Sequence, residues 1–259
     1  MNSGWTVFPL LFARQLIAGL LMMAVASYYK FPWTKNKKML GHCILAGFIM
    51  WLGFATQLYG QKFTNVSETA IYSSLYALFT PFLAYLINKS KISWRVYLAC
   101  FVAFVAVVLL SFQGSTCRFG WGEFLLLLCA LFFALHLVIL ENFGYLGAVF
   151  AISSIQMLTM AFCCLVATFL LKESLQVSGL IYVFYLAIFC SGLAFLLQIA
   201  AQIHLTAATV GLLLSFESLW GVLGAVVFFG EAFTWQIGGG CLLMLLAIYI
   251  LEAPSKNKN

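Results

Sequence analysis

Nine long apolar segments dominate this chain, at about 8–29, 40–60, 68–88, 95–113, 121–143, 148–171, 179–201, 207–229 and 236–252. A helix needs about 20 apolar residues to cross a bilayer, and hydrocarbon offers no water to backbone N–H and C=O groups, so helices satisfy them internally. Charged residues make up 8% of the chain, against about 25% in a soluble domain. The pattern predicts an all-α polytopic membrane bundle of about nine transmembrane helices.

The basic residues indicate how such a bundle is oriented. Counted alternately, the loops on one side carry nine Lys and Arg residues and those on the other side three. The larger set is Lys30, Lys35, Lys37, Lys38, Lys89, Lys91, Arg95, Lys256 and Lys258, and the smaller set is Lys62, Arg118 and Lys172. Basic loops face the cytoplasm, so the C-terminus is expected there, in a multi-pass protein of the cell membrane. The net charge of +6 follows from these loops, and no nucleic-acid partner is expected.

An internal repeat accounts for the odd number of segments. Shifting the chain by 141 residues places Gln61–Val96 over Gln202–Ile237. The identical pairs are Gln61/Gln202, Ser74/Ser215, Leu78/Leu219, Ala84/Ala225 and Trp94/Trp235. The matched helices cross in opposite directions under the charge-derived orientation, as in the inverted repeats of many secondary transporters. We therefore expect two repeats, residues 1–114 with four helices and residues 115–259 with five, so that the first helix of the first repeat is absent.

The same region resembles a known family. The segments Gln198-Ile-Ala-Ala-Gln202, Leu214-Ser-Phe-Glu217-Ser-Leu-Trp and Phe228-Phe-Gly-Glu231 are similar to the ninth-helix pattern of EamA-like members of the drug/metabolite transporter superfamily. Ser218 stands where these proteins usually have Pro. The resemblance implies ten helices in two inverted repeats, a central cavity, and alternating-access transport of small metabolites such as amino acids. A missing first helix agrees with the count from the repeat.

Glu217 is the first candidate for a functional residue, because an ionisable group inside a membrane span is expensive and usually functional. It is either a proton-coupling or cavity-lining carboxylate, or a hydrogen-bonding group that fixes a helix junction. Tyr76 occupies the equivalent position in the first repeat, so we expect it to approach the pseudo-twofold axis that relates the repeats from the other half. Glu231, at the end of its span, is expected to cap a helix.

Four further polar residues are candidates for lining a substrate cavity. Gln198 and Gln202 lie four residues apart, so both face one side of a helix, toward protein or a cavity. Gln156 lies on a polar stripe with Ser153. His136 is either a proton relay or a core histidine with satisfied hydrogen bonds.

Two other residues affect single helices. Arg14 matches an Arg that often opens the second helix of the family, and it either acts in the site or extends toward the interface. Pro81 is expected to kink the third span and to free a backbone carbonyl, which then needs another partner.

No enzyme motif, metal-ligand spacing or cofactor motif occurs in the sequence, so no catalytic residue, metal site or cofactor is expected. The predicted function is secondary transport of a small organic solute. The alternative is a shortened family member that does not transport, or a membrane scaffold. The expected partners are the solute and the lipid bilayer, with a homodimer as the further assembly considered.

Overall fold

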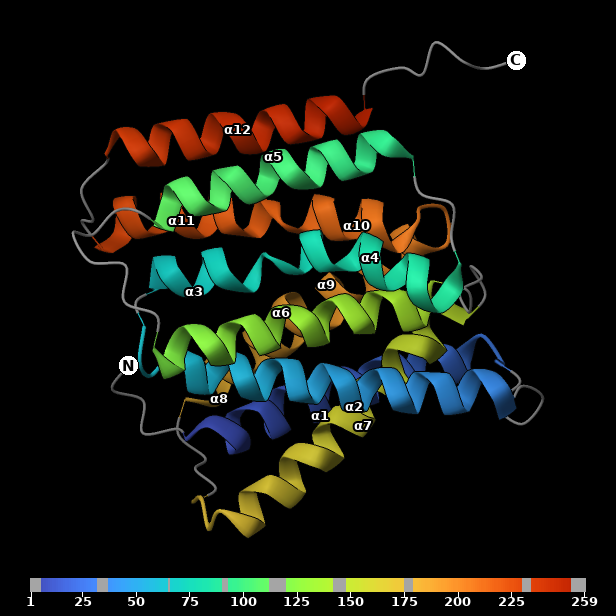
Figure 1. Cartoon of the computed structure of the whole chain (residues 1–259). Coiled ribbons are helices and arrows are strands. Elements are labelled where there is room, and N and C mark those ends of the chain that lie inside the picture. The colour runs from blue at the N-terminus through green and yellow to red at the C-terminus, as the bar shows by residue number, and fades with distance from the viewer. Residues whose placement is uncertain are drawn as a thin grey trace, which may run out of the picture. The chain divides into compact units, whose positions relative to one another are not determined.

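The computed structural model describes residues 6–31, 37–64, 66–89, 93–111, 120–141, 148–174, 179–229 and 234–252, and within these ranges the regular structure is entirely helical (Figure 1). The helices are α1 (Val7–Tyr28), α2 (Lys37–Gly60), α3 (Val66–Ser73), α4 (Tyr76–Asn88), α5 (Trp94–Ser111), α6 (Trp121–Leu140), α7 (Val149–Leu170), α8 (Leu180–Tyr185), the π-helix η2 (Leu186–Leu193), α9 (Ala194–Gln202), α10 (Ala207–Leu214), α11 (Phe216–Phe229) and α12 (Trp235–Glu252).

These helices confirm the predicted membrane bundle. Within the described ranges, six helical stretches are long and apolar enough to cross a membrane, and three shorter apolar helices, Tyr76–Asn88, Trp94–Ala106 and Gly238–Ala247, fall in the other three predicted spans. The third and eighth spans are each divided, into α3 and α4 and into α10 and α11. Sequence alone predicted each of these spans as one continuous helix.

The spacing of 141 residues recurs in the helix boundaries. α5 and α12 both have 18 residues and begin at Trp94 and Trp235, exactly one such interval apart (235 − 94 = 141). The interruption at Ser74 and that at Ser215 are separated by the same interval. α1 and α7 both have 22 residues and are offset by 142. The boundary at residue 114 between the two repeats stays a prediction.

The helices group into two compact units that do not coincide with the sequence halves. Unit 1 comprises Met1–Ala55 and Ile139–Leu205, and unit 2 comprises Thr56–Val138 and Thr206–Asn259. Each unit therefore combines segments from both predicted repeats.

In unit 1, α1 packs along α7, η2 packs against α1, and α9 packs against α7. Small side chains permit the close approach of these helices. Cys43 and Ala46 of α2 lie in one buried cluster with Ala148, Ala151 and Ile152.

In unit 2, the matched spans of the predicted repeats pack together: α5 contacts α12, and in the divided spans α3 contacts α11 and α4 contacts α10. Figure 1 shows α3 followed by α4 running alongside α11 and α10 in the reverse order. This antiparallel pairing of matched spans is the arrangement that an inverted repeat requires.

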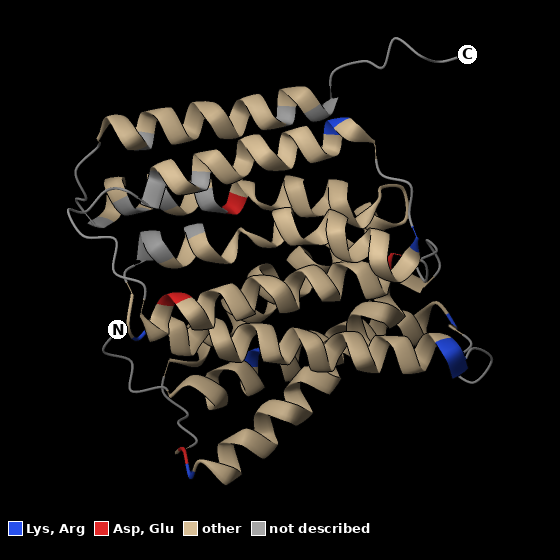
Figure 2. Cartoon of the chain, in the orientation of Figure 1, with Lys and Arg blue, Asp and Glu red and all other residues tan. Residues whose placement is uncertain are grey.

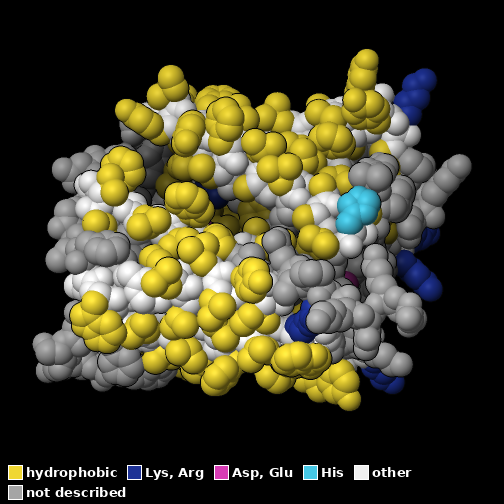
Figure 3. All heavy atoms as spheres, turned by 90° about the horizontal axis from the view of Figure 1, so that it is seen from above, with side chains coloured by type: hydrophobic (Ala, Val, Ile, Leu, Met, Phe, Trp, Pro, Cys, Tyr) yellow, Lys and Arg dark blue, Asp and Glu magenta, His cyan; other side chains and the backbone are white. Residues whose placement is uncertain are grey.

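The surface of the described helices is strongly apolar. Figure 2 shows the charged residues mostly near helix ends, and Figure 3 shows a face covered largely by hydrophobic side chains. Trp94, Phe101, Leu242 and Tyr249 of α5 and α12 are each 60–72% exposed. Lipid solvates such side chains, so their exposure fits a membrane-embedded bundle.

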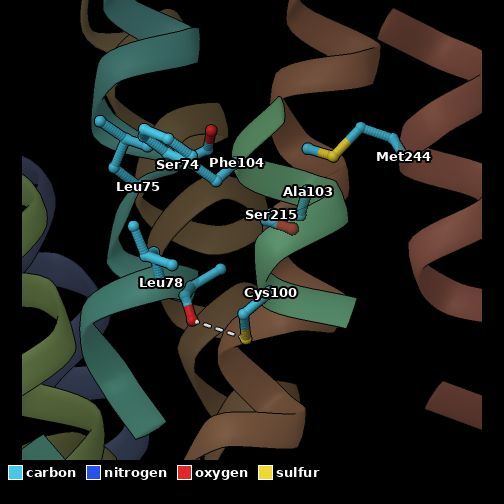
Figure 4. A pocket seen from close by; sticks show the side chains of 9 residues that line it. Ser74, Leu75, Leu78, Cys100, Ala103, Phe104, Ser215 and Met244 are labelled. Atoms are coloured by element: carbon cyan, nitrogen blue, oxygen red, sulfur yellow. Dashed lines mark hydrogen bonds between the residues drawn. The ribbon is translucent and has the colours of Figure 1, made fainter. Parts of the chain in front are cut away.

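The backbone carbonyl that Pro81 was predicted to free has another hydrogen-bond donor in the structure. Proline has no N–H to donate to the carbonyl four residues earlier, which here is Ala77. The thiol of Cys100 on α5 donates to the Ala77 oxygen at 3.3 Å instead (Figure 4). One residue earlier in each case, the Thr80 hydroxyl donates to the Tyr76 carbonyl at 2.6 Å. Side chains from α4 and α5 therefore satisfy the carbonyls around the proline.

We expect Cys100→Ala to lower the stability of the protein, because it leaves the Ala77 carbonyl without its donor, at a cost of about 1 kcal/mol. Cys100→Ser should restore most of this stability, since a hydroxyl also donates. Cys43→Ala removes an equally buried thiol and serves as the control for lost volume. Thermal unfolding in detergent measures all three. Equal losses for Cys100→Ala and Cys43→Ala would show that the hydrogen bond is unimportant.

Gly47 is a point of close contact between α2 and α7. A Cβ atom at this position would lie 2.6 Å from the backbone oxygen of Gln156 and 2.8 Å from Cβ of Thr159. Since backbone cannot move aside as a side chain can, any larger residue must separate the two helices.

We therefore expect Gly47→Ala to destabilise the protein by about 1–3 kcal/mol through overpacking. Gly41 lies on the same helix with no atom within 4 Å of an added Cβ, so Gly41→Ala should be neutral or stabilising through its higher helix propensity. Melting temperatures of the two variants in detergent test this. A Gly47→Ala protein as stable as Gly41→Ala would contradict the close contact.

Candidate functional site

Glu217 and Tyr76 occupy matching places beside the two interruptions of unit 2. Tyr76 is the first residue of α4 and Glu217 is the second residue of α11. Counted over the whole divided spans, which start at Val66 and Ala207, each is the eleventh residue, so both lie near the middle of a span. The Glu217 side chain is exposed, and it interacts electrostatically with the Tyr76 hydroxyl and the Cys129 thiol. Glu217 therefore lies within electrostatic range of the residue that the repeat aligns with it.

Aromatic packing fixes the Tyr76 side chain. Its ring meets that of Phe133 on α6 edge to face, with centroids 6.3 Å apart and an interplanar angle of 84°. Such pairs add about 0.5–1.5 kcal/mol beyond the burial of area. His136 follows Phe133 by one helical turn and is 3% exposed. The face of α6 that packs against Tyr76 through Phe133 therefore also carries the buried His136.

The interruptions themselves are tight turns. Leu75 (φ −61°, ψ −11°) and Ser215 (φ −62°, ψ −12°) adopt nearly the same backbone conformation. This conformation is close to that of a 3₁₀ turn, and the i→i+3 bond from Leu75 N to Tyr72 O agrees with it. The Ser215 hydroxyl donates to Leu212 O at 2.6 Å. A mid-helix 3₁₀ turn often marks a hinge.

A small cavity adjoins both interruptions. It has a volume of about 10 Å³ and is lined by Ser74, Leu75, Ala77, Leu78, Cys100, Ala103, Phe104, Ser215 and Met244 (Figure 4). That is about the space that one water molecule needs. The hydroxyls of Ser74 and Ser215 supply polar groups at a depth where the other lining side chains are apolar.

The three glutamine candidates lie in unit 1 and are buried. Gln156 on α7 is 2% exposed and donates from Nε2 to Ile152 O at 3.2 Å. Gln198 and Gln202 on α9 are 9% and 5% exposed. Both point toward protein, as their spacing predicted. The Nε2 of Gln198 is buried and has no hydrogen-bond partner among the described residues.

Arg14, whose role the sequence left open, forms a polar cluster with neighbouring side chains. Its Nε donates to the hydroxyl of Ser191 on η2 at 2.9 Å, and Gln15 Nε2 donates to the same hydroxyl at 3.4 Å. The guanidinium carbon lies 5.7 Å from the centroid of the Phe54 ring. Arg14 is the eighth residue of α1, as Gln156 is of α7. The side chain therefore points at a neighbouring helix of its own unit rather than toward a membrane interface.

The candidates thus divide between two groups. Tyr76, Glu217 and His136 belong to unit 2, and Gln156, Gln198 and Gln202 belong to unit 1 together with Arg14. A charged residue in an apolar span was the signal available for Arg14, whereas its partner Ser191 carries no distinguishing pattern in the sequence. Glu231 lies outside the described residues. Within the described ranges, no cluster of three or more His, Cys, Asp or Glu side chains could hold a metal ion.

We expect Ser191→Ala to destabilise the protein by about 1.5–3 kcal/mol, the usual contribution of a hydrogen bond to a charged group. Ser154 is an equally buried serine of unit 1, and its hydroxyl has no partner among the described residues. Ser154→Ala should therefore be neutral or slightly stabilising. Thermal unfolding in detergent distinguishes the pair, and equal behaviour would contradict an energetic role for the Arg14–Ser191 bond.

The chain is similar to a known transporter family and to a solved structure. Residues 1–112 and 120–252 match the model of the EamA-like transporter family. An uncharacterized transporter of Archaeoglobus fulgidus is 25% identical over 211 residues, which cover 80% of this chain and 67% of the relative. A solved crystal structure has the same fold, with a TM-score of 0.76, 17% sequence identity, and coverage of 95% of this chain and 87% of the other.

The family model covers nearly the whole length of the chain, in two stretches of which the second begins shortly after the predicted repeat boundary. Together with the apolar helices, it establishes a multi-pass membrane protein. The chain belongs to the EamA-like transporter family.

Proposed function

We propose that this protein is a secondary transporter that carries a small organic solute, an amino acid or a similar metabolite, across the cell membrane by alternating access. The observation that carries the proposal is the pair of divided spans in unit 2, with Glu217 beside one interruption and Tyr76 beside the other. Discontinuous helices near the middle of the membrane form substrate and ion sites in many secondary transporters.

A carboxylate at this depth supports a role in coupling. Ionisable side chains within membrane spans are rare and face a bundle interior or a water-filled cavity. Glu217 is exposed, and among the described groups the Tyr76 hydroxyl and the Cys129 thiol interact with it electrostatically. Such a residue can take up a proton or a cationic group of the solute at one stage of transport and release it at another.

The interruptions supply a means of movement. A helix that changes direction at one 3₁₀ turn can bend there without losing its other hydrogen bonds. At the two turns, serine hydroxyls donate hydrogen bonds to backbone carbonyls. Ser73 donates to Ala70 O at 3.2 Å, and Ser215 donates to Leu212 O at 2.6 Å. We propose that these turns flex as the binding site opens to alternate sides.

The orientation is part of the same proposal. The nine-to-three distribution of basic residues favours a cytoplasmic C-terminus in the cell membrane. Selective labelling of a cysteine added after Asn259, from one side of intact cells, would establish the side on which the chain ends.

The proposal is tested with purified protein in liposomes, supplied with radiolabelled amino acids and an imposed pH gradient. We expect solute uptake that depends on the gradient, and Glu217→Gln should abolish that dependence because an amide cannot exchange a proton. Glu123→Gln is the matched control, since Glu123 lies in the first turn of α6 and accepts from Gly120 N at 2.8 Å.

Three outcomes contradict parts of the proposal. Absence of uptake by the unmodified protein for every amino acid tested would contradict transport of this substrate class. Unchanged rate and gradient dependence in Glu217→Gln would contradict coupling through this residue. A loss in Glu123→Gln as large as that in Glu217→Gln would show that the effect is not specific to the divided spans.

A further inference from the structure

Arg14 lies well inside its span. As the eighth residue of α1, it is about 10 Å from the start of the helix at 1.5 Å per residue. Its side chain is half-buried and is directed toward η2 by the 2.9 Å bond from Nε to Ser191. An arginine at this depth is costly unless its charge is paired or solvated.

No described group neutralises this charge. The titratable groups that interact with the guanidinium are the thiols of Cys190 and Cys164, and no carboxylate is among them in the described residues. Unit 1 contains two glutamates, Glu141 and Glu173. Glu141 follows the end of α6, and Glu173 follows the end of α7, where its Oε2 accepts from Phe8 N at 3.0 Å.

The guanidinium also has donors to spare. Arginine carries five N–H donors in a planar fork, and within the described residues one of them, that of Nε, has an acceptor. The terminal nitrogens, which form the fork that grips a carboxylate in two parallel bonds, are therefore available. Phe54 lies against the guanidinium at 5.7 Å, and this contact restrains the plane of the fork.

A second unpaired donor lies on the helix that continues from η2. Nε2 of Gln198 is buried and has no partner among the described residues, and the whole side chain is 9% exposed. Gln198 follows Ser191 by seven residues, close to two helical turns. Phe195, between them, contacts Phe54 edge to face at 6.1 Å. The same aromatic ring therefore contacts both Arg14 and the helix that carries Gln198.

The π-helix gives this cluster an unusual local structure. η2 spans Leu186–Leu193 in the middle of an otherwise α-helical stretch, and Ser191 lies within it. π-helical segments are rare and often occur at functional sites, because the extra residue per turn changes the direction of the side chains. Here it brings the Ser191 hydroxyl to both Arg14 and Gln15.

We propose that Arg14 binds a carboxylate group of the transported solute, with Ser191 as the positioning residue that holds the guanidinium and Gln198 as an additional donor. This assignment rests on the proposed transport function and specifies its substrate class as a carboxylate-bearing organic solute. A single carboxylate matches the single positive charge of Arg14. A phosphate dianion would leave about one negative charge without compensation in a poorly solvated site.

The test uses the full-length protein in liposomes and the arginine reagent phenylglyoxal, with modification of Arg14 followed by mass spectrometry. The probes are pooled proteinogenic amino acids and benzoate, and the controls are the corresponding primary amides and inorganic phosphate. At ten times the dissociation constant, mass action predicts that a bound carboxylate slows modification of Arg14 about tenfold. The amides and phosphate should not slow it, and modification of Arg95 should be unchanged throughout.

A positioning variant refines the result. Ser191→Ala should leave Arg14 reactive but raise the concentration of carboxylate required for protection, because the guanidinium is no longer held in place. Unchanged protection in Ser191→Ala would overturn the positioning role.

Other outcomes overturn the carboxylate site. These are equal modification of Arg14 with carboxylates and with amides, protection by phosphate alone, or failure of Arg14 to react under conditions that modify Arg95. The labelling does not require transport, so the two proposals fail separately. Protection of Arg14 without solute uptake would support the carboxylate site and contradict the transport function. Solute uptake without protection of Arg14 would support the transport function and contradict the carboxylate site.

Discussion

The structure depends on one constraint, that a backbone carbonyl within a membrane span must have a donor. Pro81 removes the N–H that would serve Ala77 O, and the Cys100 thiol of α5 replaces it at 3.3 Å. The same need explains why hydroxyls are placed at the interruptions, where Ser73 and Ser215 donate to carbonyls of the preceding turn. The spans can therefore be divided at mid-membrane without leaving these groups unsatisfied.

Divided spans carry polar groups near the middle of the membrane. In unit 2, the equivalent interruptions place Tyr76 and Glu217 close enough to interact. In unit 1, a π-helix rather than a break disturbs the helix, and it brings Ser191 to Arg14. The two units thus contain ionisable groups of opposite sign, each beside an irregular stretch of helix. A transporter of small polar solutes needs such groups, because an apolar bundle offers a polar solute no compensation for lost hydration.

Much of this architecture could be predicted from the sequence. Span lengths follow from runs of apolar residues, and the spacing of 141 residues found in the sequence recurs in the interruptions at Ser74 and Ser215 and in the starts of α5 and α12. Span lengths and the repeat spacing can be predicted because they depend on residues that are adjacent in the chain or that recur at a fixed interval. Burial of Gln198 and Gln202 on one helix face likewise follows from their spacing of four residues.

Tertiary structure alone decided the rest. The two compact units each combine segments from both predicted repeats, because packing joins α1 with α7 and α5 with α12 across large distances in sequence. The hydrogen-bond partner of Arg14 depends on this packing. So does the role of Cys100, because the sequence alone does not distinguish it from other small apolar residues. The sequence by itself determined a membrane bundle with a repeated pattern of spans and buried polar residues. Which polar groups meet was decided by helix contacts, since a side chain buried in an apolar bundle takes whichever partner the neighbouring helix presents.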